Sequence, residues 1–379
     1  MSTLVTFKRG THTPTMRTFL LCLFVVSSAS AEVRVERVPE GGVQPQVVQS
    51  ADGTVHLVYL KGEPGSSDVR YVNRKGPARK WSEPVSVNSE PKSAVSAGTI
   101  RGAQIALGKD DTLHIVWNGR GGKGMQAALN YAHSTGAGFT AQHDLREESI
   151  NLDGGASIAA DAKGRVSVMW HGAAADATPG EQNRVVFVKR SEDNGATFGP
   201  AKIANPADKG VCACCSLKAF ATPDGELLAL YRAARSREQR DMVLLRSTDG
   251  GATFKMRTVG AWRIAGCPMS SMTILGTGST LRGAWESEGR IETALLGAGS
   301  KAQIVSPEKS RHPALAVNSR GETLVSWSVG TGWMKGGDLQ WRILDARGTA
   351  TDQQGSAKGV PVWDFTAAYA DGENFVVLF

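Results

Sequence analysis

Residues 102–118 read GAQIALGKDDTLHIVWN. Apolar side chains take every second position on either side of a turn that contains Gly and Asp, as Ile105 and Leu107 before it and Leu113, Ile115 and Trp117 after it. Alternation with a period of two is typical of a strand that buries one face, and a polar turn between two such runs is typical of a β-hairpin. The stretch therefore predicts two antiparallel strands, the second of which ends in an aromatic residue.

The same pattern recurs along the chain. Seven copies, whose first residues lie 43 to 60 residues apart, are QPQVVQSADGTVHLVYL from Gln44, GAQIALGKDDTLHIVWN from Gly102, GASIAADAKGRVSVMWH from Gly155, CSLKAFATPDGELLALYR from Cys215, MSSMTILGTGSTLRGAWE from Met269, HPALAVNSRGETLVSWS from His312 and WDFTAAYADGENFVVLF from Trp363. Repeats of about this length that hold several strands are typical of propeller blades. One hairpin cannot bury both of its faces, whereas blades stacked around an axis bury them against their neighbours. The sequence predicts an all-β fold, a β-propeller.

The number of blades follows from how the repeats are completed. Residues 185–191 and 242–248 are strand candidates between the hairpins and would form outer strands. The last copy ends with the chain, so its blade lacks such a strand, and residues 33–38 (VRVERV) can supply one. We therefore predict seven blades, with the ring closed by pairing of the N- and C-terminal strands. Six blades would result if one copy extended a neighbouring blade.

The N-terminal residues predict an export signal. Arg17 precedes an apolar run over residues 18–26, and Ala29 and Ala31 provide the small residues that a signal peptidase prefers. We assign residues 1–31 to a signal peptide, with Met16 as an alternative start, and residues 32–379 to a propeller domain that is secreted or periplasmic. No later stretch is long and apolar enough to cross a bilayer.

Composition and charge exclude several classes of protein. Hydrophobic residues make up 41% and charged residues 21% of the 379, which excludes a disordered or fibrous chain. Removal of residues 1–31 takes away three cations and no acid, so the net charge falls from +7 to +4. An excess of that size, spread along the chain, does not predict nucleic-acid binding.

Two turns carry a sharper motif, Ser-x-Asp-x-Gly-x-Thr-Phe. Residues 191–198 read SEDNGATF and residues 247–254 read STDGGATF. The Asp can accept turn amides, the Gly permits a left-handed backbone, and the Phe can anchor the turn on its blade. The residues with these structural roles are Ser191, Asp193, Gly195, Phe198, Ser247, Asp249, Gly251 and Phe254.

With these turns in phase with the repeats, the chain resembles the sialidase-like superfamily of Asp-box (BNR-repeat) propellers. The resemblance covers nearly all of residues 32–379 and implies a site on the face away from the boxes, where first strands begin and second strands end. Sialidases of the family clamp a carboxylate with three arginines, the first of which precedes a proline near the first blade. This chain has Gln44-Pro45 there, so we do not expect a standard sialidase.

Polar residues nevertheless converge on the predicted mouth. Asp153 and Glu286 are candidates for the acid and base of glycoside hydrolysis, since two carboxyl groups are what that reaction needs. Other polar residues are candidates for binding a glycan or another small anionic ligand, and arginine suits an anionic group best. They are Arg101, Gln104, Arg232, Arg311, His312 and Asp364. The alternative is that these residues satisfy strand ends and line a wet channel, while the tryptophans that end the second strands pack between blades.

The cysteines form a second unusual feature. VCACCS (residues 211–216) opens the fourth repeat and GCPMSSM (residues 266–272) opens the fifth, so a Cys214–Cys267 or Cys215–Cys267 disulfide is expected from their proximity. Alternatively, thiolates with soft or imidazole partners would bind copper or zinc. That set is Cys212, Cys214, Cys215, Cys267, Met269 and His171.

Two functional hypotheses from different classes follow. In the first, the mouth binds or hydrolyses a glycan and needs no cofactor. In the second, a non-enzymatic propeller offers the same mouth to a protein partner or, through its cysteines, to a copper or zinc ion.

Overall fold

The computed structural model describes residues 30–76, 79–98, 100–120, 127–146, 149–206, 210–277, 280–297 and 299–379. Residues 1–29 of the predicted signal peptide lie outside these ranges. The chain divides into residues 1–30 and a larger unit over residues 31–379, which holds the strands discussed below. In the described part of the chain, no helix has the length and apolar character needed to traverse a bilayer.

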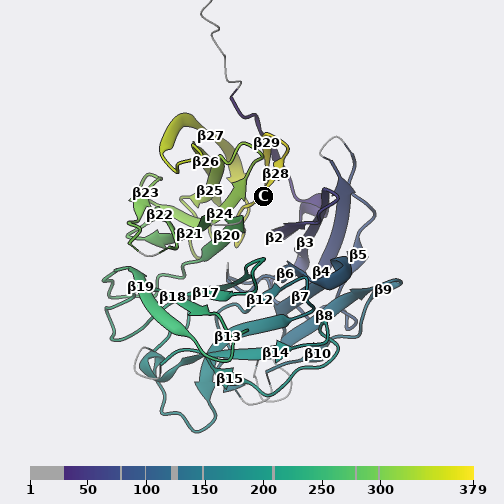
Figure 1. Cartoon of the computed structure of the whole chain (residues 1–379), viewed down its shortest axis with the longest axis vertical. Helices are drawn as coiled ribbons and strands as arrows, with labels where there is room; N and C mark the ends of the chain where they lie inside the picture. The colour runs from purple at the N-terminus through teal and green to yellow at the C-terminus, as the bar shows by residue number, and fades with distance from the viewer. Residues whose placement is uncertain are drawn as a thin grey trace, which may run out of the picture. The chain divides into compact units, whose positions relative to one another are not determined.

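The described strands of the larger unit form seven sheets arranged around one axis (Figure 1). Their strand pairs are antiparallel, apart from one parallel pair between the two terminal strands. Blade 1 holds β2 (Val43–Gln49), β3 (Thr54–Glu63), β4 (Ser66–Lys75) and β5 (Val85–Ser86). Blade 2 holds β6 (Gln104–Leu107), β7 (Leu113–Asn118), β8 (Leu129–Thr135), β9 (Gly138–Phe139) and β10 (His143–Asp144). Blade 3 holds β11 (Ser149–Ile150), β12 (Ser157–Ala160), β13 (Val166–Ala174), β14 (Val185–Ser191) and β15 (Lys202–Ile203).

The remaining blades repeat the arrangement. Blade 4 holds β16 (Leu217–Ala221), β17 (Leu227–Arg232), β18 (Met242–Ser247) and β19 (Lys255–Gly260). Blade 5 holds β20 (Met272–Thr277), β21 (Thr280–Ser287), β22 (Arg290–Leu295) and β23 (Gln303–Ile304). Blade 6 holds β24 (Ser310–Val317), β25 (Thr323–Val329), β26 (Gly337–Leu344) and β27 (Ala350–Val360). Blade 7 holds β28 (Ala367–Asp371), β29 (Asn374–Leu378) and β1 (Val33–Glu36).

Helical structure within the described ranges is limited to short 3-10 turns at η1 (Pro39–Gly41), η2 (Lys109–Asp111) and η3 (Glu181–Asn183). Each of the seven quoted repeats forms the hairpin of a first and a second strand, as the alternation predicts. The first strands β2, β6, β12, β16, β20, β24 and β28 contact one another in that order and return to β2. They enclose a central cavity of about 470 Å³.

The two ends of the strand order close the ring. β1 pairs in parallel with β29, and Val33 lies opposite Phe375. Beyond that ladder, the Val38 amide donates to the Phe379 carbonyl at 3.1 Å. The seven-bladed count and the pairing of the two terminal strands are thus confirmed.

The hydrophobic core lies between blades rather than within one central mass. Each of seven buried clusters draws side chains from two adjacent blades, and the second-strand tryptophans belong to these clusters. Trp117, Trp170, Trp285 and Trp327 are at most 2% exposed. Every blade therefore depends on both neighbours for the burial of its apolar faces.

The two Asp-containing turns fold alike. Asp193 Oδ1 accepts the Thr197 amide at 2.9 Å, and Asp249 Oδ1 accepts the Thr253 amide at 2.9 Å. Gly195 has a φ of 82°, and the Phe198 ring packs edge-on against Tyr131 of blade 2 with centroids 5.0 Å apart. The carboxylates accept amides and hydroxyls within their own turns, which is a structural role.

Closure through blade 7 makes a stability prediction. Phe375 is 1% exposed in the cluster between blades 6 and 7, so Phe375→Ala should lower the free energy of unfolding by about 3–5 kcal/mol. Val362→Ala, at a side chain 41% exposed, is the control and should change it by about 0.5 kcal/mol or less. Equilibrium denaturation in urea measures both, and a Phe375→Ala loss no larger than the control's would contradict this role of blade 7.

Candidate functional site

The mouth is the end of the channel at which first strands begin and second strands end. Polar side chains there join several of the blades to their neighbours. Asn118, at the end of β7, donates to the Gly154 carbonyl at 3.2 Å, which links blade 2 to blade 3. His171 of β13 lies 2.8 Å from the Cys215 carbonyl, and Arg232 Nε of β17 donates to Ser270 Oγ at 2.8 Å. These residues follow the aromatic positions of the repeats, so the repeat itself places them here.

His171 is neutral and fully engaged. Burial, reinforced by the Arg184 guanidinium, lowers the pKa of His171 to about 4. Its Nε2–H donates to the Cys215 carbonyl, and its Nδ1 accepts from Arg184 Nη2 at 3.1 Å. Both ring nitrogens are therefore occupied, Nε2 by blade 4 and Nδ1 within blade 3, and the role of His171 as a metal ligand stays a prediction.

Gln44 and Asp364 join blades 7, 1 and 2. The Gln44 amide donates to Asp364 Oδ1 at 2.6 Å, and its side-chain Nε2 lies within 3.0 Å of the carbonyls of Ser96, Gly98 and Trp363. Gln44 is 0% exposed. Burial raises the pKa of Asp364 to about 7, although the Gln44 and Phe365 amides oppose the shift. Gln44 thus has a structural role at the position where the family pattern expects its first arginine.

Glu286 occupies the same kind of position at the end of β21. It is 1% exposed, and its Oε1 lies 3.7 Å from Arg311 Nε of blade 6. Burial raises the pKa of Glu286 to about 7, against the opposing effect of Arg311 and Arg232. Arg232 also donates to the Glu286 carbonyl. Three of the predicted site residues are therefore brought together between blades 4, 5 and 6.

Asp153 and Arg101 form a separate, accessible pair. Arg101 Nε donates to the Asp153 carbonyl at 3.0 Å, and its Nη2 forms an ion pair with the Asp153 carboxylate. The two side chains are 29% and 43% exposed. The pair lies beside Gly98, where a Cβ would come within 3.6 Å of Arg101 Nη1 and 3.7 Å of Trp333 Cζ3.

Trp333 is a candidate that sequence reasoning missed. It lies in the loop between β25 and β26, it is 59% exposed, and its ring meets Trp363 edge-on with centroids 5.9 Å apart. The loop has no periodicity to draw attention to it. The signal that was present is the segment Gly332-Trp333-Met334, an aromatic residue placed in a glycine-containing loop at the mouth end of a second strand.

A second overlooked residue, Lys218, lies in the channel itself. Its Nζ donates to the Gln104 Oε1 at 3.0 Å and to the Gln46 Oε1 at 3.3 Å, so Gln104 binds a neighbouring side chain in this structure. Burial lowers the pKa of Lys218 to about 8. His312 also lines the channel, and its Nδ1 lies 3.0 Å from Ser271 Oγ.

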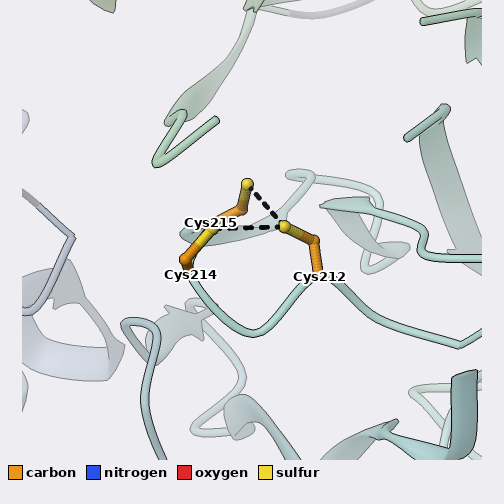
Figure 2. Close-up of side chains that lie close together, drawn as sticks. All are labelled: Cys212, Cys214 and Cys215. Carbon is orange, nitrogen blue, oxygen red and sulfur yellow. Dashed lines mark hydrogen bonds between the residues drawn. The ribbon is translucent and has the colours of Figure 1, made fainter. Parts of the chain in front are cut away.

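The cysteines are divided between a disulfide and a thiol pair. Cys214 and Cys267 form a disulfide, one of the two pairings expected from the sequence. Cys212 and Cys215 are free and buried, and Figure 2 shows their side chains turned toward each other. The sulfur atoms of Cys212, Cys214 and Cys215 lie within 4.8 Å of one another. That spacing suits a soft metal ion only if Cys214 is reduced, so copper or zinc binding stays a prediction, as does the part assigned to Met269.

Comparison with known proteins identifies the fold. No protein-family model and no curated protein sequence matches the chain. An alpha-L-arabinanase of Penicillium chrysogenum complexed with arabinobiose aligns with 83% of this chain and 96% of its own, at a TM-score of 0.54 and 12% identity. An alpha-L-arabinofuranosidase of Fusarium graminearum with arabinobiose aligns with 84% of this chain and 98% of its own, at a TM-score of 0.54 and 13% identity. A Hadza microbial sialidase aligns with 82% of this chain and 70% of its own, at a TM-score of 0.50 and 13% identity. The chain has the fold of the sialidase-like propellers, as its repeats and turns predict.

The buried carboxyl of Asp364 predicts a pH dependence of stability. Its folded pKa is raised to about 7, so at pH 4–7 the folded protein holds a proton that the unfolded chain releases. The stability of the wild type should therefore fall, relative to Asp364→Asn, by up to about 1.4 kcal/mol per unit as the pH rises through this range. Urea denaturation from pH 4 to 8 measures the difference, with the exposed Asp352→Asn as control. A difference that does not change with pH would contradict a protonated Asp364.

Proposed function

We propose that the chain binds a glycan at the mouth, with Trp333 as the surface on which a sugar ring stacks. The observation that carries the proposal is the exposed Trp333 ring, held edge-on by Trp363 beside the Arg101–Asp153 pair. A sugar presents an apolar C–H face and a rim of hydroxyls. An aromatic ring suits the first, and convergent donors and acceptors suit the second.

The exposed residues of the mouth are better candidates for ligand binding than the buried residues that link the blades. Arg232, Glu286 and Asp364 are at most 1% exposed. A ligand would have to displace contacts between blades to reach them. Arg101, Asp153 and Trp333 present free surface without any such displacement. Two of the similar structures hold arabinobiose, a disaccharide, which supports a glycan as the ligand class. The predicted export would bring the mouth into contact with glycans outside the cytoplasm.

Binding makes a direct prediction for Trp333. Trp333→Ala should weaken the binding of a glycan ligand by about 2 kcal/mol, the loss typical of an aromatic anchor. Met334→Ala is the matched control, because Met334 is the next residue and is 66% exposed but offers no ring. A glycan array, beginning with arabinobiose and sialylated oligosaccharides, identifies a ligand, and titration calorimetry then compares the variants. Equal affinity for the two variants would refute the stacking role.

Hydrolysis is the second candidate function, and Glu286 favours it. Its pKa, raised to about 7 by burial, suits a proton donor at neutral pH, as general acids of glycoside hydrolysis require. Asp153 is the proposed partner carboxylate. Because Glu286 is 1% exposed, this reaction requires the bound substrate to displace Arg311 from the Glu286 carboxyl.

Turnover of fluorogenic glycosides tests this candidate. If Glu286 donates the proton, turnover should fall as the pH rises above about 7, and Glu286→Gln should lower it about 10²–10⁴-fold. Asp153→Ala should also abolish it. Glu288→Gln, at an exposed carboxylate two residues away, should leave it unchanged. Binding without turnover in the wild type would leave the chain a lectin-like module and exclude hydrolysis of the glycosides tried.

A further inference from the structure

The four cysteines of the larger unit lie in one contact cluster between blades 4 and 5. The Cys215 amide donates to the Cys212 carbonyl at 3.4 Å, which closes a four-residue turn. Such a turn brings its first and last Cα atoms within about 7 Å, close to the range that a disulfide spans. The two sulfur atoms are already 3.0 Å apart. The backbone can therefore hold Cys212 and Cys215 either as two thiols or as a disulfide with little movement.

The Cys214–Cys267 disulfide lies directly beside this pair. Cys212 Sγ is 3.5 Å from Cys214 Sγ (Figure 2), and Cys214 is bonded to Cys267. Solvent exposure increases across the cluster. Cys212 and Cys215 are each 1% exposed, Cys214 is half-buried and Cys267 is exposed. A disulfide that reaches the surface is thus in van der Waals contact with a buried dithiol.

A hydroxyl and a guanidinium lie next to the buried pair. Ser270 Oγ lies 3.3 Å from Cys215 Sγ and accepts a hydrogen bond from Arg232 Nε. The Ser270 hydroxyl therefore connects the Arg232 guanidinium to the Cys215 thiol. The thiolate is the reactive form in disulfide exchange.

We propose that these four cysteines form a thiol–disulfide exchange centre, which moves one disulfide between the surface and the interior and exchanges it, through Cys267, with an external dithiol or disulfide. This centre is independent of the proposed glycan site. It uses cysteine side chains that take no part in the proposed glycan site.

The bonds and electrons of the exchange balance among the four cysteines. Cys212 loses its proton, and the resulting Cys212 thiolate attacks Cys214 Sγ. The Cys212–Cys214 bond forms, the Cys214–Cys267 bond breaks, and Cys267 leaves as a thiolate that takes up a proton at the surface. Cys215 then attacks Cys212 Sγ, its own proton passing to the departing Cys214. The buried pair has lost two electrons and the surface pair has gained them, so no outside oxidant is needed.

Trapping the surface thiols tests the proposal on the wild-type protein. The protein is purified without reductant under argon in the presence of a chelator, incubated folded with N-ethylmaleimide, and then denatured and mapped by mass spectrometry. We expect maleimide on Cys214 and Cys267 and a disulfide between Cys212 and Cys215. An intact Cys214–Cys267 disulfide, or maleimide on Cys212 and Cys215 instead, would overturn the proposal.

Two variants separate the steps. Cys215→Ser should stop the exchange after its first step, which leaves maleimide on Cys267 alone and a Cys212–Cys214 disulfide. Cys212→Ser removes the attacking sulfur and should lose the labelling of Cys267. Labelling of Cys267 in Cys212→Ser at the wild-type rate would contradict the assigned attacker. Circular dichroism checks that each variant is folded, and the wild-type result is decisive without them.

Discussion

The mouth of this propeller depends on polar contacts between one blade and the next. Apolar clusters fill the space between blades along their length, yet at the mouth blades 2, 3, 4, 5 and 7 each place a buried polar group that needs a partner. An unpaired buried donor or acceptor costs about 1–3 kcal/mol, so the partner must be in place when the ring closes. Asn118, His171 and Arg232 find theirs at the entry of the next first strand, and Asp364 finds its partner in Gln44. The ring is thereby closed by hydrogen bonds as well as by β1 and β29.

This constraint separates structure from function at the mouth. Residues that follow the tryptophans of the repeats are held in place by neighbouring blades, which makes them rigid but largely inaccessible. Residues on the loops beyond them, such as Arg101, Asp153 and Trp333, are positioned by that rigid rim and remain exposed. Glu286 lies at the boundary, since its carboxyl is buried but reaches Arg311 on the accessible side. The cysteine cluster follows the same gradient, from buried Cys215 to exposed Cys267.

The fold could be predicted almost completely from the sequence, because hairpin alternation is a local property and the seven copies repeat it. Ring closure was also predictable, since the last repeat lacks an outer strand that residues 33–38 can supply. The site was predictable only in outline. Position along a strand places Arg232 and Glu286 at the mouth, but their burial depends on side chains from the next blade. Trp333 lies outside the quoted repeats, and the repeat pattern does not mark Lys218 among the first-strand residues. The choice of Cys214 over Cys215 as partner of Cys267 depends on a turn that spacing does not specify.

Residue-resolved hydrogen exchange of the folded protein tests most directly whether polar contacts hold the mouth together. The amides of Gln44, from blade 1, and of Phe365, the residue next to Asp364, both donate to Asp364 Oδ1 at the junction of blades 7 and 1. If this contact is part of the cooperative structure, both amides should exchange as slowly as the central amides of β29, through global unfolding alone. Exchange at the rate of exposed turn amides, while β29 stays protected, would show that the mouth opens freely and would contradict the account.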